Sequence, residues 1–272
     1  MVAFASNSLL CRLALKQTSI DAASFTFIRI VSGAVALWLI TTMRAGAHRA
    51  LSQGNWPSAL ALFAYAAAFS FAYNSLSAAT GALLLFGAVQ ATMIFWGLHK
   101  GESLHLRQLF GLTVALAGLV ALLLPGLSAP PLGGATLMLG AGVAWGIYSL
   151  RGRGTSDAIS ATAGNFIRAV PFAAFLSLVL IHWMRVDLAG IAFASLSGAI
   201  TSGVGYVIWY LALPSLKAAS AATVQLSVPV LTAAGGILLL GEPLTIRFLL
   251  ASAAVLGGIA LVVAAPRQAM PA

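Results

Sequence analysis

Several side chains that can bind charged or polar groups lie inside long apolar stretches of the sequence. Arg168 occurs in "GNFIRAVPFAAFLSLVLI" (164–181), and Arg29 occurs in "FTFIRIVSG" (25–33). An arginine offers five N–H donors and a permanent charge, whereas an amide side chain offers donors and an acceptor without charge. The amides in comparable surroundings are Asn7, Gln90, Asn165 and Gln225. These groups are suited to hydrogen bonding and to binding.

No arrangement of reactive groups indicates an enzyme. The sequence has no GxSxG, HExxH, CxxC or Walker motif, and no predicted helix carries paired carboxylates or a histidine-rich metal site. Cys11 is the single cysteine, which excludes an intrachain disulfide and a thiolate metal cluster. We therefore expect no catalytic residue, no metal and no cofactor.

The composition shows which solvent surrounds these stretches. Of 272 residues, 61% are hydrophobic and 7% are charged, with a mean hydropathy of +1.01. Soluble domains carry roughly 25% charged residues. The apolar runs are about 18 residues long, enough for a helix to cross a bilayer, and they lack the alternation of barrel strands. We predict an all-α integral membrane protein with ten transmembrane helices. Their expected positions are near 1–15, 22–43, 56–74, 78–98, 106–124, 132–150, 160–181, 188–212, 218–240 and 245–264.

The net charge of +9 is explained by membrane topology. If both termini are cytoplasmic, eight basic residues fall on the inner side and three on the outer side, in agreement with the positive-inside rule. The inner residues are Arg44, Arg49, Lys100, Arg107, Arg151, Arg153, Lys217 and Arg267, and the outer ones are Lys16, Arg185 and Arg247. Because these charges are dispersed, we expect the lipid bilayer and no nucleic acid as a partner.

The sequence also contains an internal repeat. "FIR" occurs at 27–29 and 166–168, "GESLHLR" (101–107) matches "GEPLTIR" (241–247), and "SAAT" occurs at 77–80 and 220–223. These matches keep nearly one offset, between 139 and 143 residues, which indicates a duplication. Each copy holds five predicted helices, so the second copy enters the membrane in the opposite sense. We predict two inverted five-helix repeats, residues 1–126 and 132–266, an architecture found in many secondary transporters.

Longer phrases resemble tandem EamA domains of the drug/metabolite transporter superfamily. They are "AYNSLSAATGALLLFGAVQATMIFWGLHKGESL" (72–104) and "YLALPSLKAASAATVQLSVPVLTAAGGILLLGEPLT" (210–245), supported by "WGIYSLRGRG" (145–154) and "NFIRAVP" (165–171). The resemblance implies a central cavity lined by the first, third, fourth, sixth, eighth and ninth helices, with the fifth and tenth at the periphery. It also implies a small metabolite as substrate, often an amino acid and usually exported. The family tends to place a proline late in the fourth helix of each repeat. Pro229 provides it in the ninth helix, and the fourth helix lacks it.

Amide and aromatic side chains in the expected cavity helices are candidate substrate contacts. An amide can bind substrate there or make an ordinary interhelical hydrogen bond. Aromatic pairs close together on one helix form either a stacking pocket or part of the aromatic belt at the membrane surface. The candidates are Asn7, Gln90, Trp145, Tyr148, Tyr206, Trp209 and Gln225.

The two arginines are expected to have structural or gating roles. An arginine at the centre of a membrane helix costs roughly 2.5–3.5 kcal/mol on insertion scales, and less where the side chain reaches the interface. By inverted symmetry Arg29 lies near the outer face and Arg168 near the inner face. We expect each to bind helix-end carbonyls or brace a neighbouring helix, with direct participation in the substrate path as the alternative. Asn165 and Pro229 are grouped with them.

The acidic residues bear on the energy source. All of them fall in predicted loops or at helix ends, whereas proton-coupled carriers commonly keep a carboxylate in mid-membrane. We therefore expect a monomeric secondary transporter of the cytoplasmic membrane that works by alternating access, through facilitated diffusion or exchange. Proton-coupled efflux of drugs or toxic compounds is the alternative, and a membrane channel is a further one. The acidic residues are Asp21, Glu102, Asp157, Asp187 and Glu242.

Overall fold

A computed structural model describes residues 1–45, 52–101, 106–124, 129–152, 155–212, 225 and 227–264. These residues form helices joined by short connections, and none of them is in a strand. The first half gives α1 (Val2–Gln17), α2 (Ala22–Ala45), α4 (Trp56–Ala72), α5 (Ala78–His99) and α6 (Leu106–Leu123). The second half gives α7 (Leu132–Gly152), α8 (Ala158–Val179), η1 (Ile181–Trp183), α9 (Leu188–Leu196), η2 (Ser197–Val204), α10 (Gly205–Ala212), α12 (Ser227–Leu240) and α13 (Ile246–Ala264).

The all-helical fold predicted from the sequence is confirmed. Seven of the described helices are long and apolar enough to cross a membrane, counting 188–209 as one, and α4 and α12 are shorter apolar helices. The continuous helix 188–212 matches its predicted bounds, and α2 ends two residues beyond the predicted 43. Part of the predicted ninth helix, 218–240, falls outside the described residues. Ten membrane crossings in an inverted repeat stay a prediction.

Polar residues fix where several helices begin. Asn55, Ser77, Asp157 and Asp187 each precede a helix, and each side chain accepts a hydrogen bond from a backbone N–H of the first turn. These caps satisfy donors that have no partner within the helix, which is worth about 0.5–2 kcal/mol per cap. The two aspartates therefore sit at helix starts, as the sequence indicated.

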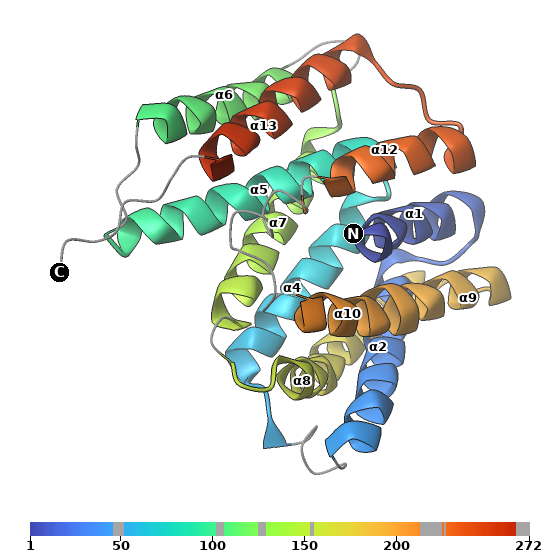
Figure 1. The fold of residues 1–272 in the computed structure, drawn as a ribbon. Helices are drawn as coiled ribbons and strands as arrows, with labels where there is room; N and C mark the ends of the chain where they lie inside the picture. The colour runs from blue at the N-terminus through green and yellow to red at the C-terminus, as the bar shows by residue number, and fades with distance from the viewer. Residues whose placement is uncertain are drawn as a thin grey trace.

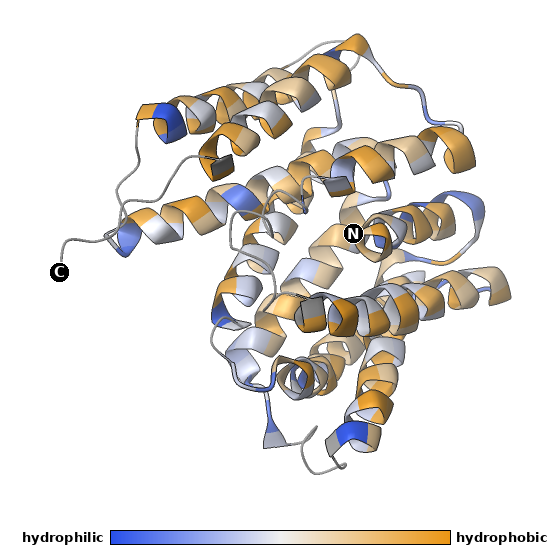
Figure 2. Cartoon of the chain, viewed as in Figure 1, coloured by the Kyte–Doolittle hydropathy of each residue, from blue (hydrophilic) through white to orange (hydrophobic). Residues whose placement is uncertain are grey.

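The helices pack into a bundle with an apolar outer surface. α6 and α13 pack along each other on one side, whereas α1 lies between α12 and α9 and also contacts α5 and η2 (Figure 1). Hydrophobic residues cover most of the helix bodies, and hydrophilic ones gather mainly at helix ends (Figure 2). Large side chains on α6 and α13, including Phe110, Val120 and Leu250, are exposed. In a bilayer this surface would face lipid.

The helix 188–212 contains one irregularity that the sequence did not predict. Between α9 and α10 the segment η2, Ser197–Val204, is π-helical. A π segment changes the rotation of the side chains that follow it, and such segments are frequent at functional sites. Ser197, Thr201 and Ser202 of η2 are all buried.

Candidate functional site

A small internal cavity lies between helices from both halves of the chain. α1, α4 and α5 supply side chains from the first half, and α7, α10 and Gln225 supply them from the second. The cavity has a volume of about 20 Å³, which is room for little more than one water molecule. Its walls include Phe4, Asn7, Tyr65, Phe69, Trp145 and Tyr206.

Asn7 connects the two halves of the chain at this cavity. Its Nδ2 donates to the Tyr65 hydroxyl at 3.2 Å, and its Oδ1 accepts from the hydroxyls of Ser197 at 2.6 Å and Thr201 at 3.2 Å. Both hydroxyls belong to η2, so the π segment supplies the partners that Asn7 needs. A buried amide with both ends bonded fixes the position of α1 between α4 and η2.

Arg29 is buried beside the same cavity, and its side chain is only 2% exposed. Nη2 donates to the Tyr65 hydroxyl at 3.0 Å, and Nε donates to Ser202 Oγ at 3.3 Å. The guanidinium carbon also lies 5.2 Å from the centre of the Tyr65 ring and 4.9 Å from that of Phe69. Both rings line the cavity. In the described part of the chain, Arg29 therefore bonds side chains of the neighbouring helices α4 and η2 rather than helix-end carbonyls.

A glycine allows η2 to approach Arg29. A Cβ added at Gly198 would collide with the Arg29 carbonyl oxygen and with Ser32 Oγ. A side chain at this position would push η2 away from α2 and would separate Ser202 from the guanidinium. The close approach of the two backbones is thus a condition for the Arg29 contacts.

Aromatic side chains enclose the cavity. Trp145 lies at the centre of this cluster, with its ring 4.9 Å from Tyr65, 5.1 Å from Tyr206 and 6.4 Å from Phe4. We call Phe4, Tyr65, Trp145 and Tyr206 the aromatic cluster. Offset and tilted contacts of this kind each contribute about 0.5–1.5 kcal/mol beyond apolar burial. Opening the cavity to a larger occupant requires these rings to separate.

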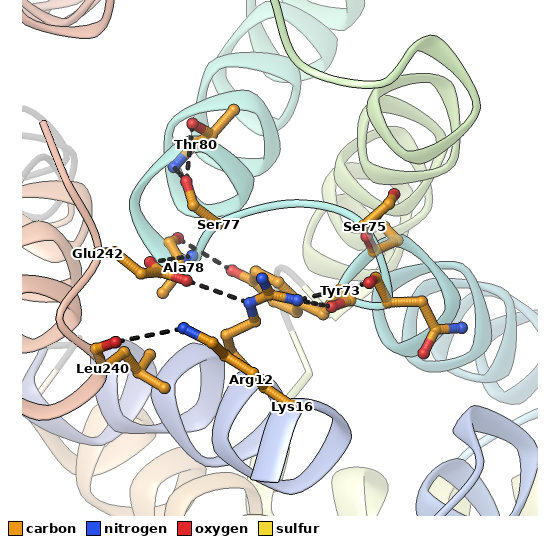
Figure 3. A network of polar contacts seen from close by, with 11 residues as sticks. Arg12, Lys16, Tyr73, Ser75, Ser77, Ala78, Thr80, Leu240 and Glu242 are labelled. Carbon is orange, nitrogen blue, oxygen red and sulfur yellow. Dashed lines mark hydrogen bonds and ion pairs between the residues drawn. The ribbon is translucent and has the colours of Figure 1, made fainter. Parts of the chain in front are cut away.

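A polar network joins both halves of the chain at one end of the bundle, which we call the Glu242 end (Figure 3). Arg12 Nε lies 3.1 Å from Glu242 Oε1, and Arg12 Nη1 donates to the Tyr73 carbonyl at 2.8 Å. Glu242 Oε2 accepts from the Ala78 backbone N–H at 2.8 Å. Glu242 thus caps α5 and pairs with α1, although it precedes α13 in the sequence.

A cleft of about 340 Å³ adjoins this network. Arg12, Lys16 and Glu242 line it, together with residues of the connections 75–77 and 241–245. Lys16 Nζ donates to the Leu240 carbonyl at 3.2 Å (Figure 3). The bonds of Arg12 to the Tyr73 carbonyl and to Glu242 join α1 to the chain on both sides of this cleft.

Asp21 and Arg185 make a second link at the Glu242 end. The backbones of these two residues exchange a bond, Asp21 N to Arg185 O at 3.0 Å, and Asp21 Oδ2 accepts from Arg185 N at 2.9 Å. Burial opposes ionisation of the Asp21 carboxyl, but hydrogen bonds from Ser24, Arg185 and Ala23 outweigh it and hold its pKa below the ordinary value. The carboxylate form is therefore the one that the fold stabilises.

The opposite end of the bundle is tied by α8. Arg168 Nη1 donates to the Gln53 carbonyl at 2.6 Å and to the Gly164 carbonyl at 3.0 Å, and Asn165 Oδ1 accepts from the Asn55 backbone N–H at 2.9 Å. Gly54, between these two partners, has a φ of +81°, a conformation that glycine adopts without strain. Arg168 thus holds the chain that leads into α4, and we call this end the Asn55 end.

The structure places the remaining predicted site residues at different distances from the cavity. Gln225 lines it and is half-buried, whereas Gln90 is buried in α5 one turn beyond Phe86 and is not among its lining residues. Tyr148 stacks on Trp145 with ring centres 5.4 Å apart, and Trp209 contacts Phe4 at 6.2 Å, so both lie behind the cluster. Pro229 is buried near the described start of α12.

Sequence reasoning missed Arg12, Phe4, Tyr65 and the hydroxyls of η2. One signal was available for Arg12, because it lies 139 positions before Arg151, the same separation as that between Arg29 and Arg168. Arg151 also bonds at a bundle end, to Ser58 Oγ at 3.0 Å. The role of Tyr65 had no local signal, since its partners are distant in the sequence.

Comparisons with known proteins agree with this architecture. The EamA-like transporter family matches residues 132–264, the second of the two predicted repeats. An uncharacterised protein of Pseudomonas aeruginosa is 58% identical over 264 residues, which is 97% of this chain and 92% of the relative. A solved crystal structure that is 18% identical covers 96% of this chain and 94% of its own, with a TM-score of 0.67. At that identity the likeness shows the fold alone.

The apolar helices and the polar groups buried between them define a multi-pass membrane protein. The chain belongs to the EamA-like transporter family. It is therefore a membrane transporter of the drug/metabolite superfamily, in a family of transporters and not of enzymes.

Proposed function

We propose that this protein moves a small metabolite, such as an amino acid or a similar compound, across the cytoplasmic membrane by alternating access, with export as the net direction. The observation that carries the proposal is the central cavity, because both halves of the chain line it. Secondary transporters built from inverted repeats bind substrate at the repeat interface near the middle of the membrane. Tyr65 and Tyr206, both on the cavity wall, are 141 positions apart, within the offset of the sequence repeat.

The bonds at the two ends of the bundle support alternating access. Arg12 and Glu242 join the halves at the Glu242 end, and Arg168 joins α8 to the start of α4 at the Asn55 end. A cavity closed at both ends is an occluded arrangement, and release to either side requires one set of bonds to break. With both termini cytoplasmic, the Glu242 end faces outward.

We propose facilitated diffusion or exchange as the transport mechanism. Asp21, Asp157, Asp187 and Glu242 all lie at helix ends in the described part of the chain, and Glu102 lies outside it. Glu242 is 7% exposed, so it is the group that would carry a coupling proton if transport were proton-driven. This makes the two mechanisms distinguishable by one residue.

The test is flux in liposomes that contain the purified protein, with radiolabelled amino acids as probes. Counterflow should occur without an imposed proton gradient. Gln225→Ala should slow it about 2- to 12-fold, the equivalent of one hydrogen bond of 0.5–1.5 kcal/mol. Gln108→Ala is the matched control, because Gln108 donates to the Val262 carbonyl at 3.4 Å between the peripheral helices α6 and α13. Flux that requires a proton gradient and is abolished by Glu242→Gln would establish the coupled mechanism instead.

A further inference from the structure

We propose that the central cavity binds a small organic anion and that Arg29 holds the carboxylate of this substrate. The inference rests on the proposed transport function and names the chemical class of its substrate. It starts from the buried guanidinium, whose Nη1 has no hydrogen-bond partner among the described residues. Nε and Nη2 are bonded to Ser202 and Tyr65, so the two N–H groups of Nη1 are left over.

Among the described residues, Arg29 also has no counter-charge. Each carboxylate in the described part of the chain is already engaged at a helix end, where it caps a helix or pairs with Arg12. The groups that contact the guanidinium are the hydroxyls of Tyr65 and Ser202 and the faces of two aromatic rings. Aromatic faces attract a cation, but they supply no acceptor in the plane of the guanidinium. Buried charges in proteins are normally paired.

Arg29 is not among the residues that line the cavity, so a ligand there reaches its charge only when the rings beside it move. Arg29 lies directly against Tyr65 and Phe69, and both of these line the cavity. The partners of Arg29 come from both predicted repeats, Tyr65 from the first and Ser202 from the second. An anion bound here would therefore contact both halves, and its charge would complete an arrangement that the protein alone leaves incomplete. A guanidinium fork matches a carboxylate in shape and charge.

The rest of the wall describes the body of the substrate. Phe4, Phe86, Trp145 and Tyr206 surround the cavity with apolar and aromatic surface. The volume of about 20 Å³ is too small for an organic molecule, so the aromatic cluster must separate when substrate enters. An aryl or alkyl carboxylate fits this wall, whereas an organic cation would meet an unpaired like charge. An amino group is not required for binding.

Three probes with the same phenyl body separate these possibilities: 3-phenylpropionate, phenethylamine and 3-phenylpropanol. We expect 3-phenylpropionate at millimolar concentration to raise the unfolding temperature of the full-length protein in detergent and to undergo counterflow in liposomes. Phenethylamine and the alcohol should do neither. Arg29→Gln should weaken the effect of the carboxylate roughly 10- to 150-fold, the loss expected for hydrogen bonds to a charged group, and Arg29→Lys should retain part of it.

Arg168→Gln is the matched control, because that arginine follows the same "FI" dipeptide but is bonded to two backbone carbonyls. It should keep the preference for 3-phenylpropionate. If Arg29→Gln does not fold, the comparison of the three probes on the wild-type protein still tests whether the cavity prefers a carboxylate. The inference is overturned if the amine or the alcohol stabilises the wild-type protein as well as 3-phenylpropionate does, if 3-phenylpropionate has no effect, or if Arg29→Gln keeps the preference.

The two proposals fail in different ways. Flux of phenethylamine without flux of 3-phenylpropionate would leave transport standing and would overturn the anion assignment. Stabilisation by 3-phenylpropionate without flux of any probe would support the anion site and count against the transport function.

Discussion

Glu242→Gln is expected to weaken closure at the Glu242 end of the bundle. Glutamine keeps the size of the side chain and one acceptor oxygen, so the bond from Ala78 N–H can remain. The charge-assisted bond from Arg12 is lost. Both side chains of this pair are largely buried, since Arg12 is 16% exposed and Glu242 is 6% exposed. Because the pair is shielded from solvent, the small values measured for surface ion pairs do not apply. A hydrogen bond to a charged group is worth about 1.5–3 kcal/mol, so the open form should gain roughly 10- to 150-fold in population.

The assay follows access to the cavity from outside the cell. Ser8 lines the cavity, and Ser8→Cys in a background with Cys11→Ala provides one thiol there. An impermeant thiol reagent should label this cysteine faster when Glu242→Gln is added, by a factor of up to roughly 150. Lys16→Gln is the control, because Lys16 is exposed and its bond runs to the Leu240 carbonyl. An unchanged rate, or equal acceleration by Lys16→Gln, would refute the assignment of the Arg12–Glu242 pair to closure.

Three other predictions address topology, the Asn55 end and pH. A cysteine at Lys100 should be shielded from the same reagent in intact cells and one at Arg185 should react, and the reverse pattern would invert the orientation. Arg168→Ala should lower the unfolding temperature and abundance of the protein, since a bond to a loop carbonyl worth about 1.5–3 kcal/mol is lost. Arg44→Ala, at an exposed position, should change neither. Normal abundance of Arg168→Ala with abolished flux would favour a direct role of Arg168 in transport. Because the pKa of the Asp21 carboxyl is lowered by folding, its stabilisation is present at neutral pH and is lost as pH falls below about 4. Thermal unfolding of Asp21→Asn should therefore vary less than that of the wild type between about pH 6 and pH 3, and an identical dependence would contradict the Asp21–Arg185 link.

The sequence by itself determined the helices and the family. Within a bilayer each backbone N–H and C=O must be bonded inside its own segment, so a long apolar run has little choice but to form a helix. For this reason the charged residues that interrupt the apolar runs predicted the bounds of α2, α5 and α13 to within about two residues. The spacing of the repeated Gly-Glu and "FIR" motifs indicated an internal duplication, and the longer phrases 72–104 and 210–245 carried the resemblance to the EamA family.

Only the tertiary structure decided what the polar side chains bind. Arg29 and Arg168 follow the same two residues, Phe-Ile, and an identical role was expected for both. Packing of η2 against α2 encloses Arg29 among the side chains of Tyr65 and Ser202, whereas Arg168 reaches backbone carbonyls at the Asn55 end. Likewise, Arg12 and Glu242 are 230 positions apart, and α1 must meet the connection between α12 and α13 before they can pair. Helix formation depends on local hydrogen bonds and hydrophobicity, but the partner of a buried charge depends on which helices lie beside it, and local sequence does not encode that arrangement.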